Sequence, residues 1–240
     1  IHDRAMILAG DYLTEVSRSL VQSQVQVKTI AAAGETAAMI LAHAEQGPPG
    51  MVAVSIRERS LFQRWMGQSV AETVWRRGRV PVFAVNAGNL KDLAENAVLP
   101  DGILIALDGS KRDRTALAFA RRLAARMGLR LTLFGGAIGR RLAKGLPRNG
   151  VSSEAGMGAY LEELAEELRT DGVEIAGIAE YAPLDKALQA MSLQIVVISP
   201  PRRRRVTRKA ARTPLMDVTQ SSAGPVILVP PERRPPPEEP

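Results

Sequence analysis

Residues 196–199 read Val-Val-Ile-Ser, and residues 52–55 read Val-Ala-Val-Ser, 144 positions earlier. A second apolar stretch recurs at the same separation, with Val-Pro-Val-Phe-Ala-Val at 80–85 and Gly-Pro-Val-Ile-Leu-Val at 224–229. Two apolar strands that recur with one fixed spacing indicate an internal duplication, and this decides how the whole chain is interpreted. We therefore expect two copies of one structural unit.

The duplication continues towards the amino terminus with a small change in spacing. Tyr12 aligns with Tyr160, and residues 25–27 align with 173–175, at an offset of 148. The difference between the two offsets falls at residues 46–50, where glycines and prolines predict a turn. An insertion at a turn costs little free energy, so both offsets fit one repeat.

The second copy gives the order of the elements. Its predicted strands alternate with predicted helices, which favours a parallel, doubly wound α/β sheet of five strands. A glycine-rich loop is expected from Gly135 to Gly158. The strands are expected at 102–107, 131–134, 173–178, 194–198 and 226–229, and the helices at 115–127, 159–170, 184–191 and 214–220.

The first copy is shorter than the second. Nothing in it corresponds to residues 101–148, so we expect it to lack its leading strand, helix and strand and to retain the last three strands. The usual size of such a unit predicts roughly 50 further residues before Ile1. The expected organisation is the carboxy-terminal part of the first copy at 1–86, a linker at 87–101, the complete second copy at 102–229 and a disordered Pro-rich tail at 230–240.

Composition argues against several kinds of chemistry. The chain has no cysteine, and its two histidines, His2 and His43, do not have metal-ligand spacing. No apolar run approaches the ~18 residues that a membrane span requires. We therefore expect a cytoplasmic protein with no metal site, no membrane span and no enzymatic activity. Four glutamates are expected to form a solvated helix face rather than a pair of catalytic carboxylates: Glu162, Glu163, Glu166 and Glu167.

The ordered motifs resemble those of the universal stress protein family. The motifs are a strand ending in Asp-Gly-Ser at 108–110, the Val-Val-Ile-Ser strand at 196–199 and the Pro-Val-Ile-Leu-Val strand at 225–229. The resemblance implies an adenine nucleotide α-hydrolase-like fold, a five-stranded parallel sheet with helices on both faces. ATP-binding members use an Asp after the first strand and a loop Gly-x2-Gly-x9-Gly-[Ser/Thr] after the fourth strand, at the point where strand order reverses.

That binding pattern survives only in part here. In the second copy Asp108, Gly109 and Ser110 follow the first strand. The family's three glycines and final hydroxyl residue correspond to Ser199, Arg202, Arg212 and Thr213 in the second copy, and to Ser55, Glu58, Gln68 and Ser69 in the first. A register shifted by one residue would recruit Gly67 in the first copy. Glycines allow backbone N–H groups to approach phosphate closely, so these substitutions predict that neither copy binds ATP in the family's manner.

Three functional hypotheses remain open from the sequence. The preferred one is a regulatory or interaction module without a cofactor, whose strands at 80–85 and 226–229 pair between the repeats or between chains of a homo-oligomer, with a protein partner as a further option. The second is an ATP- or AMP-binding stress protein that uses Asp108 and the loop arginines. The third is a polyanion contact through the basic residues between Arg202 and Arg212, although nucleic acid is not expected because no aromatic residue is interleaved with them.

Overall fold

The computed structural model describes residues 2–22, 25–47, 50–56, 70–89, 99–135, 154–179, 184, 187–188, 194–199 and 214–230. The predicted tail beyond residue 230, most of the linker and the basic stretch at 200–213 lie outside these residues. The helices are α1 (His2–Gln22), α2 (Thr36–Gln46), α3 (Val70–Arg77), α5 (Arg112–Met127), α6 (Glu154–Thr170) and α8 (Pro214–Ser221). The strands are β1 (Val52–Ile56), β2 (Val82–Asn86), β3 (Gly102–Leu107), β4 (Arg130–Gly135), β5 (Ile175–Ala179), β6 (Gln194–Ile198) and β7 (Val226–Leu228).

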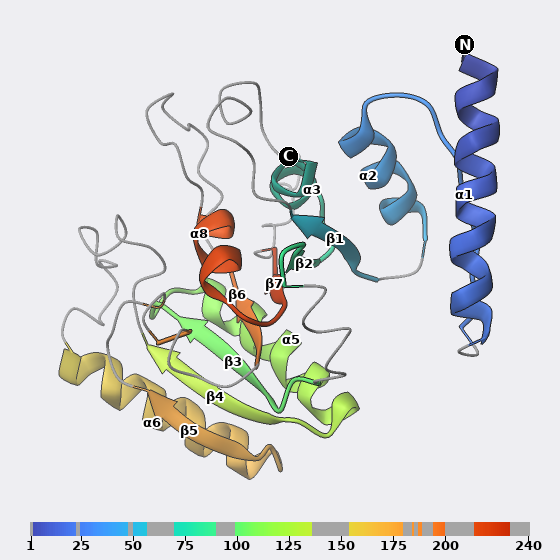
Figure 1. The fold of residues 1–240 in the computed structure, drawn as a ribbon. Helices are drawn as coiled ribbons and strands as arrows, with labels where there is room; N and C mark the ends of the chain where they lie inside the picture. The colour runs from blue at the N-terminus through green and yellow to red at the C-terminus, as the bar shows by residue number, and fades with distance from the viewer. Residues whose placement is uncertain are drawn as a thin grey trace, which may run out of the picture.

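All seven strands form one sheet, in the order β1-β2-β7-β6-β3-β4-β5 (Figure 1). In the second copy the chain runs outward from β3 through β4 to β5 and then returns to the other side of β3 to form β6 and β7. These five strands are mutually parallel. The predicted α/β class with a doubly wound parallel sheet is therefore confirmed.

The strand registers agree with the internal repeat. Val52 of β1 lies opposite Val82 of β2, and Val196 of β6 lies opposite Val226 of β7. Both residues of the second pair are 144 positions beyond their counterparts in the first. The last two strands of each copy therefore pair in the same register.

The two copies meet at an antiparallel joint between β2 and β7. Phe83 lies opposite Ile227 at the centre of the joint. Beyond the strand end, the side-chain amide of Asn89 donates to the carbonyl oxygens of Ser222 at 3.0 Å and Ala223 at 3.2 Å. The stretches at 80–85 and 226–229 thus pair within the chain and lie inside the sheet, and its outer strands are β1 and β5.

Alternating residues along the strands build two apolar layers. Ile103 and Ile105 of β3 pack with α5 and α6 on one face of the sheet. Leu104 of the same strand points to the opposite face, where residues of α2, α3 and α8 complete the core. Helices therefore cover both faces of the second copy, as a parallel sheet requires.

Two sequence predictions about local structure were wrong. Residues 25–30 form no strand, although they align with the start of β5. The strand β5 pairs only with β4, and among the described residues no strand of the first copy corresponds to β4, so residues 25–30 have no neighbouring strand. The loop expected from Gly135 to Gly158 is also shorter, because α6 already begins at Glu154 and packs Met157 against the sheet.

Gly135 explains how α6 approaches β4 so closely. A Cβ atom at this position would lie 2.5 Å from Met157 Cγ and 2.8 Å from Leu161 Cδ1. These distances are shorter than any normal van der Waals contact, so the glycine is needed for packing rather than for a turn. Among the described helices, none is both long and apolar enough to cross a bilayer.

Candidate functional site

The candidate site lies at the carboxyl ends of β3 and β6. These strands are neighbours, and from them the chain proceeds in opposite directions across the sheet. In open α/β sheets this switch point is where ligands bind. Asp108, Gly109 and Ser110 follow β3, and Ser199 follows β6, so the structure brings together four of the residues that the sequence selected.

Both carboxylate oxygens of Asp108 are already occupied. Oδ1 accepts a hydrogen bond from the backbone N–H of Ser110 at 3.0 Å, and Oδ2 pairs with Arg112 Nη2 at 2.7 Å. Gly109, between Asp108 and Ser110, has a φ of 75°, a left-handed conformation that glycine adopts without strain. The carboxylate therefore shapes its own turn and is neutralised by the first residue of α5.

Arg112 also connects the two strands of the switch point. Its Nε atom donates to the carbonyl oxygen of Ser199 at 3.2 Å, while Nη2 holds Asp108. One guanidinium group thus bridges the residue after β3 and the residue after β6. We call these three residues, Asp108, Arg112 and Ser199, the arginine bridge.

Asp113 lies beneath the turn and is nearly fully buried, with 4% of its surface exposed. Its Oδ2 atom accepts hydrogen bonds from the backbone N–H of Asp108 at 3.1 Å, from that of Gly109 at 2.7 Å and from the hydroxyl of Tyr160 at 3.2 Å. Burial, and secondarily the charge of Asp108, raises the pKa of Asp113 to about 7. Burial and the charge of Asp113 also raise the pKa of Tyr160.

Sequence reasoning missed Arg112, Asp113 and Tyr160 as parts of this site. Tyr160 served only as a marker of the repeat, and it comes from α6, far along the chain. Asp113 carried a weak signal, since an acidic residue in the first turn of a helix is normally exposed and interacts with the helix dipole. Only the fold reveals that this carboxylate is buried against the preceding turn.

Two hydroxyl groups at the switch point have no partner among the described residues. Ser110 Oγ and Ser199 Oγ are both inaccessible to solvent, and neither makes a hydrogen bond there. The predicted positions Arg202, Arg212 and Thr213 lie outside the described residues, as do Glu58, Gln68, Ser69 and Gly67 of the first copy. Ser55 is described, and it lies in β1 with its side chain exposed.

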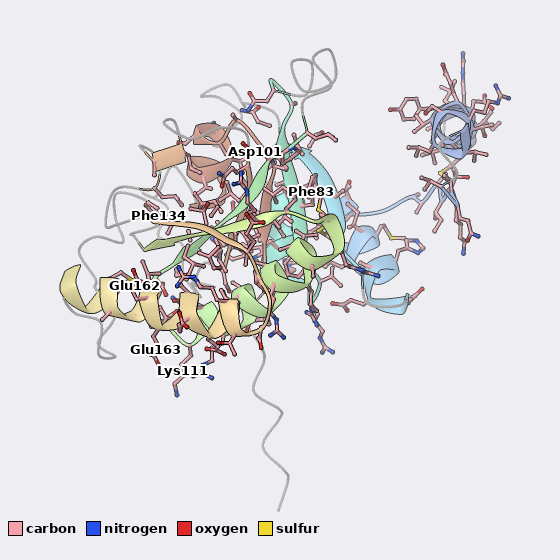
Figure 2. All side chains as sticks on the ribbon, turned by 90° about the horizontal axis from the view of Figure 1, so that it is seen from below. Phe83, Asp101, Lys111, Phe134, Glu162 and Glu163 are labelled. Carbon is pink, nitrogen blue, oxygen red and sulfur yellow. The ribbon has the colours of Figure 1, made fainter. Side chains whose placement is uncertain are left out.

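The other residues considered as candidate metal ligands or catalytic groups are exposed where the structure describes them. Within the described part of the chain, no group of three His, Asp or Glu residues is placed to hold a metal ion. His43 is an exposed residue of α2. Glu162 and Glu163 lie on the outer side of α6 (Figure 2), and they are exposed together with Glu166 and Glu167.

Fold and site together define the class of protein. A doubly wound sheet with polar residues at its switch point is typical of α/β proteins that bind ligands at the carboxyl ends of their strands. Within that class, residues 5–86 match the Universal stress protein family. This match lies within the first copy, and it confirms the resemblance found in the sequence.

Solved structures share the fold over most of the chain. A universal stress protein from Archaeoglobus fulgidus DSM 4304 is 21% identical, with a TM-score of 0.73 over 95% of this chain and 78% of that chain. A functionally unknown protein from Pseudomonas aeruginosa PAO1 is 15% identical, with a TM-score of 0.61 over 92% of this chain and 78% of that chain. No curated protein matches the chain. The structural likeness therefore extends the fold, though not a ligand, to the second copy.

Proposed function

We propose that this protein is a universal stress protein that serves as a regulatory or interaction module and does not bind ATP in the manner of the family's ATP-binding members. The arginine bridge is the observation that carries this proposal. The aspartate that would meet a nucleotide is held by Arg112 at 2.7 Å and by the Ser110 N–H at 3.0 Å. A nucleotide that used Asp108 would first have to break these contacts.

The sequence after β6 supports the same conclusion. Ser199 and two arginines stand where the family has glycines, and Pro200 and Pro201 supply no backbone N–H donors. In the first copy Glu58 would set a carboxylate against the phosphates. From these residue types we expect neither copy to offer the set of closely approaching backbone donors on which phosphate binding depends.

Isothermal titration of the whole chain with Mg-ATP tests the proposal. We expect no binding with a Kd at or below about 10 µM, which corresponds to about −7 kcal/mol. Arg112→Ala removes the bridge, and Arg122→Ala is the matched control because Arg122 is an exposed residue of the same helix. A Kd at or below about 10 µM that Asp108→Ala abolishes would overturn the proposal.

A second candidate function is binding of ATP or AMP at the switch point. The observation that favours it is the pair of buried hydroxyls, Ser110 Oγ and Ser199 Oγ, which have no partner among the described residues. Such groups are costly unless a ligand or water satisfies them. In this alternative, Arg112 would release Asp108 and turn to the phosphates, and the titration above distinguishes the two functions.

The remaining expectations are also proposals. We expect no enzymatic activity, a cytoplasmic location and association into homo-oligomers, which sedimentation at micromolar concentration would detect. Because β2 and β7 pair with each other within one chain, association between chains has to use another surface. The basic stretch from Arg202 to Arg212 stays a candidate polyanion contact, and a steep loss of affinity with added salt is its test.

A further inference from the structure

We propose that Asp113 is a proton-sensitive latch that fastens the Asp108–Gly109 turn to α6. The geometry carries the idea, because one carboxylate oxygen, Oδ2, gathers donors from two separate segments. Two of the donors are the consecutive backbone N–H groups of Asp108 and Gly109, and the third is the hydroxyl of Tyr160. The latch therefore consists of Asp113, the two amides and Tyr160.

The surroundings of the carboxylate set the pH at which it changes charge. Burial raises the pKa of Asp113 most, and the charge of Asp108 raises it further. The two amides and Tyr160 act in the opposite direction, since each hydrogen bond stabilises the ionised form. Among the described residues, the charged and titratable groups at the latch are Asp108 from the turn, Arg114 from α5 and Tyr160 from α6, and Arg112 contacts Asp108. The balance places ionisation near pH 7.

Protonation changes what the latch holds. The ionised carboxylate accepts from every group around it, whereas the protonated carboxyl presents an O–H donor. The contacts of Asp113 that the structure describes are all donors, so a proton on Oδ2 either displaces one of them or requires the Tyr160 hydroxyl to turn from donor to acceptor. The turn is therefore fastened above about pH 7 and loosened below it.

The latch reaches the switch point through Asp108. The backbone N–H of Asp108 is held by Asp113, and its side chain holds Arg112, which in turn donates to Ser199. A proton on Asp113 thus weakens the hydrogen bond that holds the Asp108 backbone, and so affects the arginine bridge without any direct contact between Asp113 and Arg112 or Ser199. This inference goes beyond the proposed function, because the latch operates whether or not a ligand binds at the switch point.

An NMR titration of the whole chain between pH 5 and 9 tests the latch. The ¹⁵N and ¹H shifts of the Gly109 amide should titrate with a midpoint near 7, and Asp113→Asn should abolish the titration. Tyr160→Phe should raise the midpoint, since it removes a hydrogen bond to the ionised form. Asp108→Asn should lower the midpoint, since it removes a like charge. His43→Gln is the control, because His43 is an exposed residue of α2 outside the latch, and it should leave the midpoint unchanged.

Two results would overturn the latch. One is a Gly109 titration that persists with the same midpoint in Asp113→Asn. The other is a direct titration of the Asp113 side-chain carboxyl carbon in the unaltered protein with a midpoint near 4. This second measurement needs no substitution, so it decides the question even if Asp113→Asn does not fold.

Discussion

Helices α1 and α6 hold equivalent places in the two copies and have opposite surroundings. In α6, Leu161 and Ala165 are fully buried against the sheet. In α1, Ile7 is 64% exposed and Tyr12, the counterpart of Tyr160, is 65% exposed. Both views show α1 standing away from the sheet, with side chains pointing outwards all around it in Figure 2.

The difference lies in what each helix can pack against. Helix α6 connects β4 to β5 and covers both strands together with α5. Among the described residues, no counterpart of β3, α5 or β4 lies against α1, so its apolar side chains have no sheet beneath them. The same lack leaves residues 25–30 without a strand partner and Ala53 and Ser55 of β1 exposed. Burial is therefore a property of the assembled layers and not of the helix sequence.

The sharpest way to break this comparison is a matched pair of truncations, Leu161→Ala in α6 and Leu13→Ala at the aligned position in α1. Leu161 is fully buried, so its truncation should lower the free energy of unfolding by about 2–5 kcal/mol. Leu13 has no buried layer around it, so its truncation should cost under about 0.5 kcal/mol. Urea unfolding of both variants measures the two losses, and losses of equal size would show that α1 packs as α6 does.

The second prediction concerns pH and uses Asp113, which belongs to the segment without a counterpart. Its pKa is raised from 3.8 to about 7, so the folded state binds more protons than the unfolded chain between these values. Stability should therefore fall as pH rises from about 4 to 7, by an amount on the order of a few kcal/mol, and level off above. The hydrogen bonds of the ionised latch offset only part of this loss, because burial of the charge has the larger effect on the pKa. Asp113→Asn should flatten this part of the curve, as measured by urea unfolding at several pH values.

The control for that prediction is Asp11→Asn, which alters an exposed carboxylate of α1. We expect its stability to follow the unaltered protein at every pH. A curve for Asp113→Asn that falls as steeply as that of the unaltered protein would mean that some other group causes the pH dependence.

The third prediction tests the joint between the copies. Asn89→Ala removes two hydrogen bonds from the start of the linker, just after β2, to the backbone carbonyls after α8. The expected loss is about 1 kcal/mol, because one donor group is removed and the freed carbonyls meet solvent or each other. Thermal unfolding checks this, with Asn86→Ala as a control that removes only a local bond to the Gly88 N–H. A larger loss for Asn86→Ala would place the important contact within the first copy.

The smallest expected effect concerns the start of α2. Glu35 accepts hydrogen bonds from the backbone N–H groups of Ala37 at 3.1 Å and Ala38 at 2.8 Å. Glu35→Ala should cost about 0.5–1 kcal/mol, as is usual for a lost helix cap. Faster hydrogen exchange at these two amides, with α6 unchanged, is the expected observation. Glu45→Ala, an exposed change within α2, should leave their exchange as it is.

The sequence was sufficient to predict where the repeated strands lie and insufficient to predict which segments find a neighbouring strand. Residues 52–55, 80–85 and 226–229 lie in strands or at their ends because their apolar pattern suits a sheet in either copy. The pattern of 25–27 is equally suitable, yet no strand forms there, because a strand also needs a neighbour to receive its hydrogen bonds. Local pattern therefore predicts which segments can pair but not whether they do.

For the candidate site, too, the sequence identified some of the residues and the fold was needed to identify the others. Asp108, Gly109 and Ser110 could be selected from the sequence because they follow directly on a predicted strand. The role of Asp113 depends on the hydroxyl of Tyr160, which is 47 residues away and reaches the carboxylate only after α6 has packed. Arg112 likewise acquires its role from Ser199, 87 residues further along the chain. Contacts at such separations follow from the topology of the sheet.

The antiparallel joint between β2 and β7 has a consequence for binding. Because β1 and β2 run opposite to the five strands of the second copy, the carboxyl end of β1 and the carboxyl end of β6 lie at opposite ends of the strands of the sheet. These two ends are separated by about the length of a strand, about 17 Å for five residues. A small molecule at one end of the strands does not reach the other. Only a bivalent partner long enough to reach around the sheet would engage both, and its avidity would depend on that span.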